Sequence, residues 1–316
     1  MKQRTFKLDV PEYEQIPEFM KILDDLSVGN NVFLVGPAGT GKSTLARLVV
    51  YSFMNRAVND GKELPFVKIN CNQWTSPTDI KGGQTIEGYR EGGLIEAWRD
   101  GKILILDELP KLDPNTAGIL NDALAESSIA DAVIFNGLNQ PIKKHPDFGC
   151  IATGNVIGKS VSGNYSGNNK QDASLIDRFS GNIYQVGFNT VLERRVIYPE
   201  VVEICIKIRD KILELEGGTN SMDPDELMTL RTMIHFNKIY ELEMLRSTRL
   251  EDENGNTHPR NERGKRLRDS LESYFMAMSN DKAMVIKEDL QIIDFYRTYP
   301  ASRQEFIAEY KKRHAA

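Results

Sequence analysis

Short apolar runs alternate with stretches of helical periodicity through the first half of the chain. Apolar residues three and four positions apart predict helices, among them 19–26, 44–50 and 115–126. The apolar runs between them predict strands at residues 32–35, 66–70, 103–106, 148–153 and 182–186. The run at 103–106 is continuously apolar, as is typical of a strand buried on both faces of a sheet. This half of the chain is therefore predicted to be an α/β domain.

Three stretches of the same half show neither helical periodicity nor a long apolar run. Residues 74–95 are rich in glycine and are predicted to be irregular, either as a surface loop or as a functional insertion. The strand-like run 132–135 ends at Asn136-Gly137, a pair that strongly favours a hairpin turn. Residues 158–169 are predicted to form a second loop rich in glycine and asparagine.

From about residue 190 glycine becomes scarce and helical periodicity continues almost to the end of the chain. One helix is predicted from Val201 to Leu215, and Asp223 to Glu226 are predicted to open the next, which runs through Leu227, Leu230, Ile234 and Ile239. A polar stretch at 251–265 predicts a loop, and further helices follow, the last at 304–313. We expect two domains, an α/β core at 1–190 and a helical part at 191–316.

Composition narrows the classes of protein. The 316 residues are 40% hydrophobic and 27% charged, and no apolar run reaches the roughly 18 residues that a membrane helix needs. The N-terminus lacks a signal-peptide core, so we expect a cytoplasmic protein without a membrane partner. The three cysteines are far apart and suggest neither a disulfide framework nor a zinc site. A net charge of −5 does not favour a protein that coats nucleic acid.

The segment with the clearest chemistry follows the first predicted strand and opens the next helix. It reads Gly36-Pro37-Ala38-Gly39-Thr40-Gly41-Lys42-Ser43, which matches the P-loop pattern G-x-x-x-x-G-K-[ST] in its confirming context. The glycines let backbone N–H groups converge on a phosphate, and the helix start adds a positive dipole end. Lys42 would reach the β- and γ-phosphates, and the Ser43 hydroxyl would hold Mg²⁺. An ordinary glycine-rich turn is the alternative.

Two acids end the buried strand at 103–106. Asp107 and Glu108 have the form of a Walker B element, in which Asp107 would help hold Mg²⁺ and Glu108 would polarise the attacking water. The alternative is a pair of solvated loop residues. Together with the P-loop, these acids predict hydrolysis of a nucleoside triphosphate.

These motifs, with Asn155 and Arg178-Phe179 at their spacings, resemble those of AAA+ ATPases. The closest branch holds the MoxR-type ATPases, the dynein-related modules and the chelatase ATPases. Within it, the stretches 145–155, 163–167 and 177–179 are most similar to cobaltochelatase CobS-type ATPases. The resemblance covers about residues 16–240. It implies a P-loop AAA+ parallel-sheet core with helices on both faces, followed by a smaller all-helical lid domain.

The resemblance also implies roles for single residues. Asn155 matches sensor 1, which orients the attacking water or contacts the γ-phosphate. Arg178 matches the arginine finger that a neighbouring subunit inserts, and Arg231 matches the sensor 2 arginine of a lid helix. Tyr89 would lie in an insertion that faces the pore or a partner. The alternatives are a surface salt bridge for Arg178, an ordinary helix former for Arg231 and a loop aromatic for Tyr89.

The predicted cofactors are ATP and Mg²⁺. The residues expected to contact the nucleotide are Gly36, Pro37, Ala38, Gly39, Thr40, Gly41, Lys42, Ser43, Thr44 and Arg231. The leading hypothesis is an ATPase that forms a homo-oligomeric ring, usually a hexamer in this family, and remodels a protein partner. A nucleic-acid motor on the same core is one alternative, which the basic stretch 260–268 keeps open, and a nucleotide-gated scaffold with little hydrolysis is another.

Overall fold

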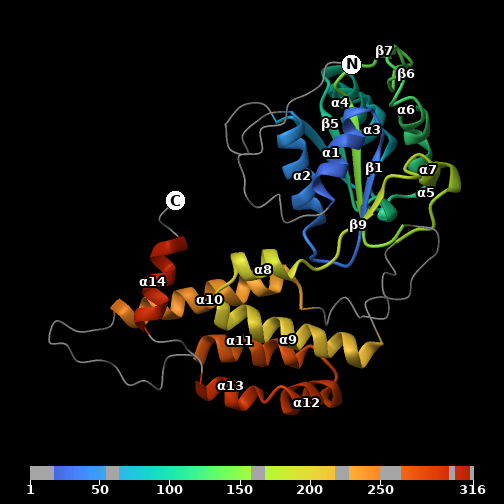
Figure 1. Ribbon diagram of the computed structural model, residues 1–316. Helices are drawn as coiled ribbons and strands as arrows, with labels where there is room; N and C mark the ends of the chain where they lie inside the picture. Colours follow the sequence, from blue (N-terminus) through green and yellow to red (C-terminus); the bar gives the residue numbers. More distant parts are fainter. Residues whose placement is uncertain are drawn as a thin grey trace. The chain divides into compact units, whose positions relative to one another are not determined.

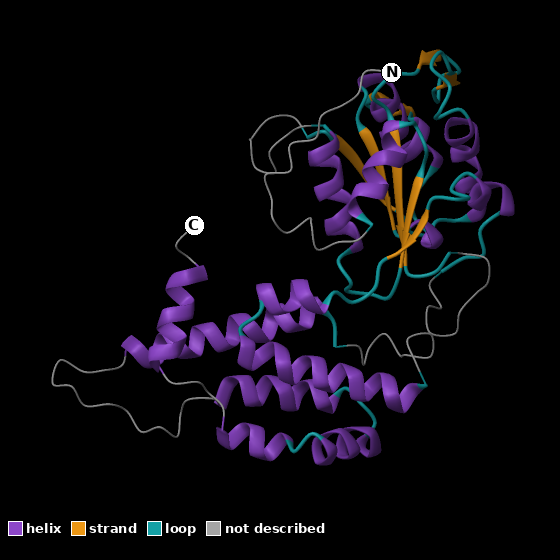
Figure 2. Ribbon diagram, in the orientation of Figure 1, coloured by secondary structure: helices purple, strands orange, loops and turns teal. Residues whose placement is uncertain are grey.

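The computed structural model describes residues 18–54, 64–157, 168–217, 228–249, 265–298 and 303–313 (Figure 1). The chain divides into two compact units, residues 1–187 and residues 188–316. The first unit contains a central sheet with helices around it, and the second is helical (Figure 2). Among the described residues, no helix combines the length and the apolar character needed to cross a membrane.

The central sheet of the first unit has five strands in the order β2-β5-β8-β1-β9. Each neighbouring pair in this order is parallel. Because parallel strands need crossover connections, the helices between them cover the sheet. The strands are β1 (Val32–Val35), β2 (Phe66–Asn70), β5 (Ile103–Asp107), β8 (Gly149–Gly154) and β9 (Ile183–Gln185).

Alternate residues of the strands supply two hydrophobic cores, one on each face of the sheet. Leu34, Ile105 and Ile151 pack with α1 (Phe19–Ser27) and α2 (Lys42–Phe53). Phe33, Leu104 and Cys150 belong to the other core, with side chains of α4 (Gly93–Asp100), α5 (Pro114–Ala117), the short helical turn Gly118–Leu120, α6 (Asn121–Ala125) and α7 (Ala173–Asp177). The predicted α/β class with helices on both faces is confirmed.

The glycine-rich stretch predicted to be irregular contains regular structure, so that prediction was wrong. It holds α3 (Pro77–Lys81) and an antiparallel hairpin of β3 (Gly83–Thr85) and β4 (Gly88–Arg90). Ser76 and Asp79 form a capping box at the start of α3. Strands of three residues are too short to show an alternating pattern, which is why the sequence did not reveal them.

A second hairpin joins β6 (Val133–Phe135) to β7 (Pro141–Lys143), as predicted, but its turn is longer than Asn136-Gly137. The Asn136 side chain accepts hydrogen bonds from the N–H groups of Leu138 and Gln140 and so extends the turn through residue 140. The tip contacts the end of α3, just before the first hairpin, because Gly137 N–H donates to Lys81 O at 3.0 Å. A Cβ at Gly137 would lie 1.9 Å from Gly82 O, so this contact requires glycine.

The second unit packs its helices around a core that includes Tyr198, Tyr240 and Phe306. Its helical character confirms the prediction for the C-terminal region. The described helix in the region after Asp223 begins at Leu230, and the Thr229 hydroxyl accepts from Thr232 N–H at 3.2 Å. Residues 223–227, where the helix was predicted to open, lie outside the described residues, as does nearly all of the predicted loop at 251–265. The helices are α8 (Thr190–Val196), α9 (Pro199–Glu216), α10 (Leu230–Arg249), α11 (Lys265–Met276), α12 (Asn280–Asp289), α13 (Ile292–Thr298) and α14 (Arg303–Arg313).

A buried ion pair fastens α8 to α9. The Arg209 guanidinium donates to both carboxylate oxygens of Glu193, at 2.6 and 2.7 Å, and both side chains are 2% exposed. The guanidinium also lies over the Phe188 ring, 4.3 Å from its centroid. Each charge is thus paired in a site that water does not reach, which makes both partners necessary.

Candidate functional site

The loop between β1 and α2 has the backbone that its glycines predict. Gly39 and Gly41 adopt positive φ angles of 73° and 89°, a left-handed conformation that glycine takes without steric cost. Gly41 is the residue before α2, so the turn delivers the chain directly into the first helical N–H groups. Such a helix start, behind a glycine-rich turn, is an anion-binding structure.

Gly36 is required for a different reason, which is the close approach of another segment. A Cβ at this position would lie 2.0 Å from the carbonyl oxygen of Val186, just after β9. Backbone hydrogen bonds join the ends of β8, β1 and β9 here, since Gly36 N–H donates to Gly154 O and Val186 N–H donates to Val35 O. Gly36 thus lets the loop begin between β8 and β9.

Lys42 lies inside the loop that precedes it. It is only 6% exposed, and its ammonium donates to the carbonyl oxygens of Gly36 and Pro37, both at 2.8 Å. It also donates to Asn155 Oδ1 at 3.0 Å. Asn155 directly follows β8, so the parallel sheet brings together two predicted site residues that are 113 positions apart in the sequence.

Asp107, at the end of β5, has both carboxylate oxygens engaged. Oδ1 accepts from the hydroxyls of Ser43 and Thr153, each at 2.6 Å, and Oδ2 pairs with Lys68 Nζ at 2.6 Å. Burial opposes ionisation of this carboxyl, but the hydrogen bonds from Lys68, Ser43 and Thr153 outweigh it and hold its pKa below the usual range. Asp107 is therefore ionised and fixed beside the start of α2.

Glu108 adopts a strained backbone. Its φ and ψ angles are 62° and 41°, a left-handed conformation that costs a residue with a side chain about 1–3 kcal/mol. Its N–H donates to Thr153 Oγ1 at 3.1 Å, and its carboxylate pairs with Lys111 Nζ at 3.2 Å. The strained turn directs the two consecutive acids to different surroundings at the carboxyl edge of the sheet.

Lys68 and Thr153 were missed by the sequence analysis. Lys68 was a lone charge in an otherwise apolar predicted strand, and Thr153 was a small polar residue at the end of another. Each signal is weak by itself. Both gain meaning only from the strand order β2-β5-β8, which puts them on either side of Asp107.

The oxygen donors around Ser43 and Asp107 fit Mg²⁺. Mg²⁺ is bound by one or two protein oxygens together with substrate phosphates and water, rather than by a full protein cage. The Ser43 hydroxyl and the Asp107 carboxylate, 2.6 Å apart, are ligands of this hard type. Across the described ranges, no group of three or more His, Cys, Asp and Glu residues could hold a metal by itself.

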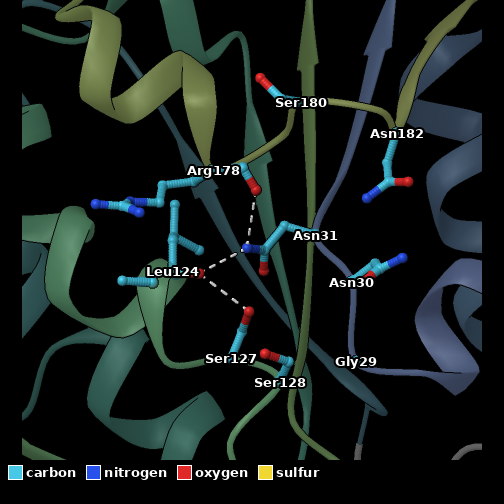
Figure 3. A pocket seen from close by; sticks show the side chains of 10 residues that line it. Gly29, Asn30, Asn31, Leu124, Ser127, Ser128, Arg178, Ser180 and Asn182 are labelled. Carbon is cyan, nitrogen blue, oxygen red and sulfur yellow. Dashed lines mark hydrogen bonds between the residues drawn. The ribbon is translucent and has the colours of Figure 1, made fainter.

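Arg178 lies away from these residues. It follows α7 and precedes β9, at the amino edge of the sheet, whereas the P-loop and the two acids lie at the carboxyl edge. It borders a polar pocket of about 220 Å³ beside Asn31, whose amide donates to the carbonyl oxygens of Leu124 and Arg178 (Figure 3). Arg178 Nε is buried and has no hydrogen-bond partner among the residues that the structure describes.

Three further predictions concern Arg231, Tyr89 and residues 163–167. Arg231 is exposed in the first turn of α10, within the helical unit. Tyr89 lies on β4, where its hydroxyl donates to Lys81 O at 3.4 Å. Residues 163–167, which contribute to the chelatase resemblance, lie outside the described residues.

Several known proteins share parts of this sequence. An uncharacterized protein of Staphylococcus epidermidis is 26% identical over 194 residues, which are 58% of this chain and 63% of that protein. An uncharacterized protein of Staphylococcus haemolyticus is 29% identical over 163 residues, which are 48% of this chain and 54% of that protein. The chain thus spans less than two thirds of the length of these curated relatives.

The chain is also similar to solved structures and to a family model. Crystal structures of NtrX from Brucella abortus in complex with ATP and with ADP are 16% and 17% identical and have TM-scores of 0.46. The alignments cover 97% and 96% of this chain and 67% and 66% of those chains. Residues 31–179 match the family model described as AAA domain (dynein-related subfamily), a range that includes Lys42, Asp107, Asn155 and Arg178. Residues 31–179 are thus similar to the AAA domain of the dynein-related subfamily, in agreement with the predicted AAA+ fold.

Proposed function

We propose that this protein hydrolyses ATP with Mg²⁺ at the carboxyl edge of the sheet. The observation that carries the proposal is the pair of contacts that join the P-loop helix to the neighbouring strands. Lys42 reaches Asn155, and Ser43 reaches Asp107, although the sequence separates each pair widely. An anion-binding loop, a place for a hard cation and a candidate base thus share one edge of the sheet.

The P-loop would hold the nucleotide. The first N–H groups of α2 and the loop backbone from Gly36 to Gly41 face a phosphate chain, and Lys42 supplies a positive charge for the β- and γ-phosphates. Ser43 and Asp107 would hold Mg²⁺, which neutralises phosphate charge when it is bound. Thr44 and the residues between the glycines complete the expected contacts.

Hydrolysis would follow from the neighbouring side chains. Water attacks the γ-phosphorus in line with the bond to the bridging oxygen, and that bond breaks to give ADP and phosphate. Glu108 accepts the proton of the attacking water, and Asn155 orients it. The Thr153 hydroxyl donates to Asp107 and accepts from Glu108 N–H, and these two hydrogen bonds keep the acids in fixed positions.

A ring of subunits would complete the site. Arg178 lies at the opposite edge of the sheet from its own P-loop and has a buried Nε without a partner in the described chain, which supports a role in a neighbouring copy. There it would stabilise charge on the γ-phosphoryl group. We propose a homo-oligomer, a hexamer by resemblance, that remodels a protein partner as MoxR-type and CobS-type ATPases do, with the helical unit as its lid and Arg231 as a nucleotide sensor.

Two measurements test this proposal. The mass in solution is determined with and without a slowly hydrolysed ATP analogue, and ATP turnover is determined for the wild type, Glu108→Gln and Arg178→Ala. We expect growth to a ring with nucleotide, and loss of turnover in both variants while Glu108→Gln still binds ATP. A monomer in which Arg178→Ala turns over normally would refute the ring, and unchanged turnover in Glu108→Gln would refute the assigned base.

A further inference from the structure

Lys68 is a charged residue on a strand of the sheet that has no part in the P-loop or Walker B patterns. Its Nζ lies 2.6 Å from Asp107 Oδ2, and its side chain is 33% exposed, against 11% for Asp107. β2 is an edge strand, so the stem of Lys68 borders solvent while its charged end reaches inward. The pair therefore differs from an ion pair between two exposed side chains, which contributes little.

The register of the sheet explains why Lys68 reaches this carboxylate. Asn70 is paired with Asp107 across β2 and β5, and Lys68 is paired with Ile105. Residues two apart in a strand share a face, so Lys68 and Asp107 both lie on the face covered by α2. Asp107 lies two residues beyond Ile105, the partner of Lys68, so the long Lys68 side chain extends along the strand to reach the acid from the edge of the sheet.

The two oxygens of Asp107 are consequently divided between different donors. Oδ1 receives only hydroxyl donors, from Ser43 and Thr153, and Oδ2 receives the ammonium of Lys68. A carboxylate held at one oxygen only can turn about its Cβ–Cγ bond and tilt that oxygen away from its partners. With Lys68 on the second oxygen, the carboxylate plane is fixed at both ends, and the other oxygen stays directed at Ser43 and the P-loop.

We propose that Lys68 is a positioning residue for Mg²⁺: it holds Asp107 so that Oδ1 and the Ser43 hydroxyl together face the metal that accompanies the nucleotide. This inference rests on the proposed ATP site. Lys68 touches neither metal nor nucleotide and acts through Asp107. Partners of this outer kind typically change metal affinity by about 10–100-fold when they are removed.

The test measures binding rather than turnover. A fluorescent, slowly hydrolysed ATP analogue is titrated onto the wild type, Lys68→Met and Lys68→Arg, first in EDTA and then at increasing Mg²⁺. We expect equal affinities in EDTA and a Mg²⁺ requirement about tenfold higher in Lys68→Met. Lys68→Arg should have a Mg²⁺ requirement close to that of the wild type, because it keeps a cation at Oδ2. Thermal melting establishes that each variant is folded, and Lys68→Gln replaces Lys68→Met if the latter is not.

A matched control is Lys143→Met, which removes a lysine from the ion pair with Asp131 on the second hairpin, 2.8 Å long and exposed on both sides. It should leave the Mg²⁺ requirement unchanged. An unchanged requirement in Lys68→Met would overturn the inference, and so would a lower one, since that would make Lys68 a competitor of the metal. If the wild type binds the analogue without any effect of Mg²⁺, the inference fails alone; if it does not bind at all, the proposed function fails.

Discussion

Thr153 donates a hydrogen bond of 2.6 Å to Asp107 and thereby joins the ends of the adjacent strands β8 and β5. Its hydroxyl oxygen also accepts from the N–H of Glu108 at 3.1 Å, and the residue is only 1% exposed. One buried hydroxyl therefore holds the side chain of the first acid and the backbone of the second. Asn155, two residues further along, contacts Lys42.

Replacing Thr153 by valine removes this hydroxyl at nearly constant volume. We expect Thr153→Val to lower the free energy of unfolding by about 2 kcal/mol, because a hydrogen bond to a charged group is lost in a buried place. ATP turnover should fall as well, since both acids lose a fixed contact. Urea unfolding and steady-state kinetics measure the two effects. Thr153→Ser is the control and should retain most of both; a loss in Thr153→Ser that is absent in Thr153→Val would show that packing of the methyl group matters instead.

Gly36 and Gly118 form a matched pair for testing the tight approach at the P-loop. A methyl group at Gly36 would overlap Val186 O, whereas one at Gly118 would meet nothing within 4 Å. Gly36→Ala should lose about 1–3 kcal/mol of stability and weaken nucleotide binding, because the loop or the end of β9 must move. Gly118→Ala should be neutral or slightly stabilising. Chemical unfolding and nucleotide titration of both variants check this, and similar behaviour of the two would contradict it.

The left-handed backbone of Glu108 can be tested apart from its carboxylate. Glu108→Ala and Glu108→Gly both remove the acid, so both should lose hydrolysis. Only glycine relieves the strain of a φ angle of 62°, and we expect Glu108→Gly to be more stable than Glu108→Ala by about 1 kcal/mol. Thermal melts of the two variants in parallel decide the point. Glu108→Ala being the more stable of the two would mean that the strain is absent in solution.

The helical unit should be sensitive to the loss of either partner of the buried pair of Glu193 and Arg209. Glu193→Leu or Arg209→Met leaves one buried charge without its partner, and each should lower the free energy of unfolding by about 3–5 kcal/mol. The double variant Glu193→Leu/Arg209→Met removes both charges and should recover a large part of that loss. A double-mutant cycle in urea measures the coupling, and strictly additive losses would argue against a coupled pair. Arg194→Met, which breaks the exposed pair with Glu203, is the control and should cost little.

The cysteines should be unreactive in the folded protein. Burial, together with the nearby charges of Asp107 and Glu108, raises the pKa of the Cys71 thiol to about 12, and burial also raises the pKa of Cys150 and Cys205. The thiolate is the nucleophile, so at pH 8 these thiols stay protonated and do not react. Labelling with iodoacetamide, followed by mass spectrometry, should modify them only after urea unfolds the chain. Rapid modification of the native protein would contradict the described burial.

Local patterns predicted the strands, the turn and the first helix, because each depends on residues that are close in the sequence. The P-loop and the acids at 107 and 108 were found for the same reason. The contacts of Lys68 and Thr153 with Asp107 depend instead on which strands are neighbours, and nothing in the chain states that β5 lies between β2 and β8. The left-handed φ of Glu108 was equally invisible, since it is imposed by the surroundings on a residue that does not favour it.

The start of α10 depends on a side chain that composition did not single out. The described helix begins at Leu230, where the Thr229 hydroxyl accepts from Thr232 N–H in the first turn. The predicted start at Asp223 to Glu226 lies outside the described residues. Arg178 was identified from the sequence, but its position at the amino edge of the sheet is seen only in the structure, because it depends on how the strands are arranged.

The contact between Gly82 and Gly137 defines where foreign sequence can be inserted into this unit. Gly82 lies between α3 and the first hairpin, Gly137 lies in the turn of the second hairpin, and a larger side chain at 137 would push these two segments apart. The tip of the first hairpin is free of this constraint, because Ile86 is fully exposed. Peptide tags or binding loops grafted at residue 86 should therefore leave β5 and β8 undisturbed, whereas grafts that replace either glycine would separate the end of α3 from the turn of the second hairpin.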